Sequence, residues 1–185
     1  MKKVTILACA LFAMMTPALV KAQSETYKLF KVDVGAGYGF GKAKGVLFYA
    51  EPKFNLHDNF AAGLRFEGAI LGNVSGNDQY ASADISAIGS YALTGDYYVG
   101  TNGFRPFGGL GVGLFNMGSV SVDSETTEVP EMNVGTKFGV VPRIGFEAGH
   151  FRMGLEYNLI TGQPSDFNRN YFSLKLGAVI GGGKK

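Results

Sequence analysis

Eight separate stretches of this chain alternate apolar and polar residues with a period of two. In the first, Phe30 to Phe40, apolar side chains such as Val32 and Tyr38 occupy the even positions, whereas charged residues and glycines occupy the odd ones. The other seven stretches are Val46–Leu56, Phe60–Ile70, Tyr80–Leu93, Phe104–Phe115, Lys137–Ala148, Phe151–Leu159 and Tyr171–Ile180. A period of two predicts strands with one apolar and one polar face. Only Ile88 interrupts the pattern of the fourth stretch.

The lengths of these stretches and of their connections indicate how the strands are joined. Transmembrane strands need about 9 to 11 residues, whereas strands of soluble proteins cluster near 5 or 6. Short connections at His57–Asn59 and Gly149–His150, with a longer one at Thr94–Gly103, alternate with connections that are mostly long and polar. The latter are Gly41–Gly45, Gly72–Gln79, Asn116–Thr136 and Thr161–Arg169. This pattern predicts an all-β fold, an eight-stranded antiparallel up-and-down transmembrane β-barrel.

The polar faces of the predicted strands carry a balanced set of charges. We expect the following residues to form a polar network in the lumen: Lys31, Asp33, Glu51, Lys53, Arg65, Glu67, Asp84, Arg105, Arg143, Glu147, Arg152, Glu156 and Lys175. Glycines on the same faces suit a narrow, crowded interior. Because eight strands leave room only for side chains, this network is interpreted as a structural core. The alternative is a narrow proton or ion path.

Alternation by itself leaves open which face is outside. In a soluble periplasmic β-barrel the apolar face points inward and binds a small apolar ligand. We favour lipid on the outside, because the apolar faces carry almost no charge and the polar charges can neutralise one another in the lumen.

The N-terminus is typical of a secretory signal. Lys2 and Lys3 precede a short apolar segment, and Val20–Ala22 offers small residues for cleavage, so we expect residues 1–22 to be removed and residues 23–185 to form the barrel domain. Cys9 is the only cysteine, so the mature chain has no disulfide. Removal of three lysines leaves 17 − 3 = 14 basic against 15 acidic residues. We therefore expect no nucleic-acid partner.

Two segments resemble a known family. Phe104–Gly113 (FRPFGGLGVG) and Gly149–Asn158 (GHFRMGLEYN) look like strands of small OmpA/OmpX-like outer-membrane β-barrel proteins. The resemblance is pattern-like and extends over the whole mature chain. It implies a barrel in a Gram-negative outer membrane, inserted by the barrel-assembly machinery. We expect a monomer in contact with outer-membrane lipid and lipopolysaccharide. The chain departs from such barrels in its ending, Gly181–Lys185, where they often end on an aromatic residue.

The sequence offers no arrangement that points to catalysis. Some eight-stranded outer-membrane barrels modify lipid A with a histidine near the outer leaflet, but His57 and His150 fall in predicted periplasmic turns without a nearby serine. The acidic residues of Asn116–Thr136 match no calcium motif. We therefore expect no enzyme, no cofactor and no metal. The long outer connections are the expected interaction surface, for adhesion, envelope integrity or host contact.

Overall fold

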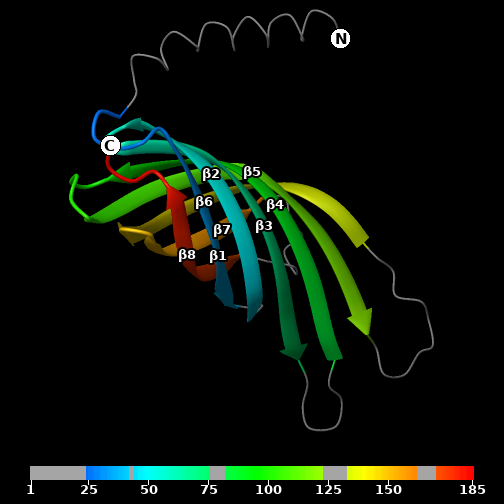
Figure 1. Cartoon of the computed structure of the whole chain (residues 1–185). Helices are drawn as coiled ribbons and strands as arrows, with labels where there is room; N and C mark the ends of the chain where they lie inside the picture. The colour runs from blue at the N-terminus through cyan, green and yellow to red at the C-terminus, as the bar shows by residue number, and fades with distance from the viewer. Residues whose placement is uncertain (1–23, 42–43, 76–81, 123–132, 162–169) are drawn as a thin grey trace, which may run out of the picture.

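The computed structural model describes residues 24–41, 44–75, 82–122, 133–161 and 170–185. These residues form one closed antiparallel barrel in which every strand pairs with its neighbours in sequence and β1 pairs with β8 (Figure 1). The strands are β1 (Phe30–Gly41), β2 (Lys44–His57), β3 (Phe60–Ser75), β4 (Ser82–Tyr98), β5 (Phe104–Val122), β6 (Asn133–Ala148), β7 (Phe151–Ile160) and β8 (Tyr171–Gly181). The predicted fold class is confirmed.

Alternation along each strand divides the residues between two environments. In β7, for example, Arg152, Gly154, Glu156 and Asn158 are buried in the lumen, and the residues between them face outward. Strands β1 and β8 close the barrel, and their residues pair from Lys31↔Gly181 to Gly41↔Tyr171. Because the sheet closes on itself, no strand is left with an unpaired edge over this length.

The two ends of the barrel differ. The turn end carries the connections after β2, β4 and β6 together with both ends of the described chain, and the loop end carries the other four connections. Strands β3 to β6 have 16 to 19 residues, against 10 to 14 in β7, β8, β1 and β2. Their ladders continue as far as Ser75↔Ser82 and Ser119↔Asn133. We call the part of β3 to β6 that extends beyond the other strands at the loop end the raised wall; it points downward in Figure 1.

Three predicted connections are too long. The predicted loop Asn116–Thr136 is paired as strand up to Val122 and again from Asn133, the predicted loop Gly72–Gln79 belongs to β3 as far as Ser75, and the predicted turn Thr94–Gly103 belongs to β4 as far as Tyr98. All three segments are rich in glycine and polar residues, which weakens the apolar alternation. Their backbones nevertheless complete the hydrogen-bond ladder of a neighbouring strand, and that ladder needs no apolar side chains.

The N-terminal segment 1–22, predicted to be a cleaved signal, lies outside the described residues. In the part of the chain that is described, no helix is long and apolar enough to cross a membrane.

Candidate functional site: an apolar belt around a filled lumen

Large apolar side chains face outward on all eight strands. They include Val46 on β2, Leu64 on β3, Leu93 on β4, Leu110 on β5 and Ile144 on β6, each between 44% and 62% exposed. A surface of this kind is unusual for a protein in water, where contiguous apolar patches of more than a few hundred Å² are rare. We call this surface the apolar belt.

Aromatic side chains border the apolar belt. Near the turn end the outward-facing set is Phe30, Phe54, Phe60, Tyr97, Phe104, Phe146 and Phe151; nearer the loop end it is Tyr38, Phe40, Phe138, Tyr157 and Phe172. Three further outward-facing rings, Phe48, Phe66 and Tyr91, lie between the two sets. Along β1 the step from Phe30 to Phe40, on a strand tilted by roughly 40°, corresponds to about 25 Å along the barrel axis. Two aromatic girdles at this separation are typical of barrels that span a bilayer.

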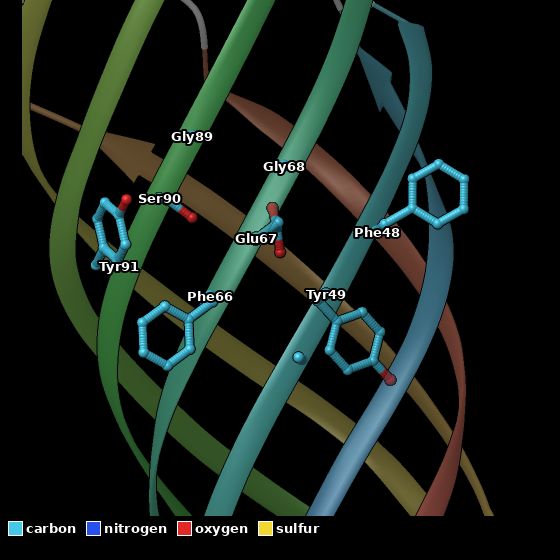
Figure 2. Close-up of a pocket in the computed structure, with 9 residues that line it drawn as sticks. Phe48, Tyr49, Phe66, Glu67, Gly68, Gly89, Ser90 and Tyr91 are labelled. Atoms are coloured by element: carbon cyan, nitrogen blue, oxygen red, sulfur yellow. The ribbon is translucent and has the colours of Figure 1, made fainter.

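One stretch of the apolar belt has no side chains. Gly68 on β3 and Gly89 on β4 pair with each other, and a Cβ on either would meet no atom within 4 Å. A hollow of about 450 Å³ lies here, and Figure 2 shows Phe48, Phe66 and Tyr91 around it. The hollow opens on the outer surface, so it is a depression in the apolar belt and not a chamber of the lumen.

The lumen contains charged side chains from every strand. Among the described residues, seven cationic and six anionic side chains are buried there: Lys31, Lys53, Arg65, Arg105, Arg143, Arg152, Lys175, Asp33, Glu51, Glu67, Asp96, Glu147 and Glu156. This set contains all of the predicted lumen residues except Asp84, which lies in β4 but whose side chain is outside the described part. It also contains Asp96, which the sequence analysis assigned to a turn.

Asp96 lies at the centre of the ion pairs. Its carboxylate oxygens lie 2.8 Å from Lys53 Nζ, 2.7 Å from Arg143 Nε and 2.8 Å from Arg152 Nη2. Arg143 also donates to Glu51, with Nη2 2.8 Å from Oε1. Three cations from three strands therefore share one carboxylate. The continuing alternation of Ser90, Ala92, Thr94, Asp96 and Tyr98 is the signal by which the sequence could have identified it.

Further ion pairs extend from this centre in both directions. Toward the turn end, Glu147 pairs with Arg105 and lies 2.5 Å from Lys31 Nζ. Toward the loop end, Glu156 pairs with Arg65 and lies 2.6 Å from Lys175 Nζ, which also pairs with Glu67. Because opposite charges alternate along the lumen, each buried ion has a partner that offsets part of its desolvation cost.

An apolar cluster closes the lumen at the loop end. Its members are Leu47, Tyr49, Ala69, Leu71, Ile88, Phe115, Val141, Ile160 and Tyr171, all buried. This layer was not predicted, because parity alone does not distinguish these residues from the rest of the polar face. Ile88, which interrupts the alternation, points into this cluster, and its irregularity was the available signal.

The turn end is covered by both ends of the described chain. We call residues Ser24–Leu29 together with Gly182–Lys185 the terminal strap. The carboxylate of Asp58, in the β2–β3 turn, accepts hydrogen bonds from Ser24 Oγ (2.6 Å), from the Thr26 amide (3.0 Å) and from Thr26 Oγ1 (2.8 Å). These bonds stabilise the charged carboxylate and lower the pKa of Asp58 to about 2. The contribution of Asp58 to stability is therefore present above its unfolded pKa of about 4 and is lost as the pH falls toward 2.

Both histidines lie at the turn end, in the predicted turns. His57 Nδ1 accepts a hydrogen bond from the Asn59 amide (3.3 Å), and His150 Nδ1 donates one to the Val179 carbonyl (2.8 Å). Within the described ranges, no group of three or more His, Cys, Asp or Glu side chains is placed to hold a metal ion. What the described residues present is an apolar outer surface around a lumen of buried charges.

Comparison with known proteins relates this arrangement to solved structures. No protein-family model matches the chain, and the curated proteins contain no significant match. Neisserial surface protein A matches with a TM-score of 0.51 at 16% identity, covering 83% of this chain and 96% of that chain. The N-terminal β-barrel domain of Pseudomonas aeruginosa OprF matches with a TM-score of 0.47 at 15% identity, over 81% and 96%. The outer membrane enzyme PagL matches with a TM-score of 0.46 at 15% identity, over 80% and 99%.

These matches are to the fold. At 16% identity the likeness to Neisserial surface protein A says nothing of a shared activity, because one fold hosts many functions. It does agree with the resemblance on which the sequence analysis relied. The chain thus has the eight-stranded barrel fold of the small OmpA/OmpX-like outer-membrane proteins.

Proposed function

We propose that the protein is a non-enzymatic barrel of the bacterial outer membrane, exported through a cleaved signal, with a filled lumen and an interaction surface at its loop end. The observation that carries this proposal is the inverted distribution of residues: apolar side chains outside on all eight strands and ion pairs inside. A bilayer accepts a closed barrel because every backbone group is paired within it. Outer-membrane lipid and lipopolysaccharide would surround the belt, after insertion by the barrel-assembly machinery.

The filled lumen argues against transport. Large apolar side chains such as Leu47 and Phe115 occupy its loop end, and ion-paired residues occupy its middle. An ion in transit would have to displace both layers. The same filling argues against a soluble barrel that binds an apolar ligand inside, since the middle of the lumen is charged and the apolar surface lies outside.

The raised wall supports a surface role. About 9 to 11 residues of a strand cross the bilayer, whereas β5 has 19. The remainder of β5 extends beyond the apolar belt, and so do the loop-end parts of its neighbours. On its outward face, Thr136 Oγ1 donates to Asn116 Oδ1 (2.6 Å), a polar pair that marks the border of the belt. A hydrogen-bonded sheet held above a membrane offers a rigid platform for adhesion, envelope integrity or host contact.

Fractionation tests the membrane assignment. We expect the protein to sediment with outer membranes and to remain there in alkaline carbonate, because the apolar belt is in contact with hydrocarbon. In a detergent gel it should migrate differently before and after boiling, as closed barrels do when they unfold. Recovery from the soluble periplasmic fraction would support the ligand-binding barrel instead.

Shortening the raised wall tests the surface role. We expect replacement of Ser119–Asn133 by a two-residue Asn-Gly turn to leave the heat-dependent gel shift intact, because the pair Gly118↔Val134 would still close the hairpin. Adhesion to surfaces or host cells, compared with the parent strain, should be lost. Retention of every surface phenotype by a folded, shortened barrel would contradict a role for this wall.

A further inference from the structure

The terminal strap crosses the turn end and is held on three sides. On one side it binds Asp58 as described above. On the opposite side Tyr27 Oη donates to the Thr101 carbonyl in the β4–β5 turn, at 2.7 Å. Between these anchors the two chain ends pair with each other: the Lys28 amide donates to the Gly183 carbonyl (2.9 Å) and the Lys185 amide to the Thr26 carbonyl (3.0 Å).

A small chamber lies beneath the terminal strap. Its volume is about 190 Å³, and its lining includes Tyr27, Arg105, Glu147, His150 and Val179. Tyr27 is only 5% exposed, and its ring lies 3.9 Å from the guanidinium carbon of Arg105. Tyr27 therefore separates the last ion pair of the lumen, between Arg105 and Glu147, from the solvent at this end.

The terminal strap is built differently from the barrel wall. The ladder between β1 and β8 ends at Lys31↔Gly181, and the strap adds one isolated bridge, Tyr27↔Lys184, beyond it. Gly181 and Gly182 have φ angles of +79° and +67°, a conformation that turns the chain out of β8 and across the mouth. Apart from the ring of Tyr27, the strap's described contacts are mostly hydrogen bonds. Segments with few apolar contacts open at lower free energy than the core.

We propose that the terminal strap is a lid that seals the lumen at the turn end and opens without unfolding the barrel. Tyr27 is its stopper, the side chain that covers Arg105, and Asp58 is its latch, the carboxylate that holds the strap by hydrogen bonds. When the lid is closed, the Arg105–Glu147 pair is kept from water and its attraction is strong. When the lid is open, the chamber and the lumen charges nearest to it are exposed to the periplasm.

A single cysteine in the chamber tests the lid. Val179 faces the chamber and is 3% exposed. Because Cys9 lies in the segment expected to be removed, Val179→Cys supplies the one thiol of the mature protein. Its modification by a maleimide can be timed on the folded, detergent-solubilised protein. We expect slow modification with the strap intact. Adding Asp58→Ala, which removes the latch, or Tyr27→Ala, which removes the stopper, should raise the rate by about tenfold or more, as for a segment whose local opening becomes easier.

Two controls make the outcome decisive. Lys44→Cys, at an exposed position at the loop end of β2 and therefore far from the strap, should be modified at the same rate with and without Asp58→Ala. The unheated gel band should show that both strap variants remain closed barrels. An unchanged rate at Val179→Cys in both variants would overturn the lid, because the strap would not be what shields the chamber. Loss of the folded band in both would overturn it as well, because the strap would then be an integral part of the wall.

Discussion

Asp96→Asn should be among the most destabilising single substitutions in the barrel. The change keeps the shape of the side chain but leaves Lys53, Arg143 and Arg152 around a neutral amide. Breaking a buried ion pair by removing one partner typically costs about 3–5 kcal/mol, because the remaining charge stays buried without compensation. Here three cations lose their shared carboxylate. The free energy of unfolding, measured by urea titration in detergent or lipid, should fall by at least this amount.

A second substitution distinguishes charge imbalance from general damage. Lys53 keeps its ion pair with Asp33 (2.6 Å), but without Asp96 the lumen holds an excess of cations. Adding Lys53→Met to Asp96→Asn removes one cation of that excess, so the double variant should be less destabilised than the sum of the two single variants. Glu25→Gln, which neutralises an exposed carboxylate in the terminal strap, should change stability by no more than about 0.5 kcal/mol. A value for Asp96→Asn as small as that of Glu25→Gln would show that the ion pairs around Asp96 contribute little to the fold.

Leu110→Arg should also lower stability strongly. Leu110 faces outward at 52% exposure, midway along the apolar belt between Phe104 and Leu114 on the same strand. An arginine at the midplane of a bilayer costs about 2–4 kcal/mol on the lipid face of a barrel, and about 0–1 kcal/mol near the interface. We therefore expect Leu110→Arg to lower the free energy of unfolding by about 2–4 kcal/mol, as measured by refolding titrations into lipid vesicles.

Asn116→Arg is the matched control, because Asn116 lies on the same strand and the same outward face but at the border of the apolar belt. Asn116→Arg should lower the free energy of unfolding by only about 0–1 kcal/mol. Equal stability of the two variants in vesicles would contradict the placement of the belt.

Much of the fold was predictable from the sequence because a membrane-spanning strand has little freedom. Each strand must turn an apolar face to lipid over about 9 to 11 residues, so a period of two sustained over eight stretches specifies both the class and the two faces. The charges of the lumen followed from the same parity, and Lys31, Glu67 and Arg143 are buried where that parity puts them. Where polar and glycine residues obscure the period, as around Thr94 and Asn116, the strand ends were misplaced.

The partners within the lumen were decided by the tertiary structure alone. Arg143 on β6 meets Asp96 on β4 and Glu51 on β2, a contact set by the stagger between strands and by the narrow diameter of the barrel. Parity states which side a residue faces but not its height along the axis, and the height depends on the register of every ladder around the closure. The apolar layer around Phe115 and the terminal strap across the mouth depend on the same stagger. The sequence by itself therefore determined which residues face outward and which face the lumen, and closure of the barrel decided which of them touch.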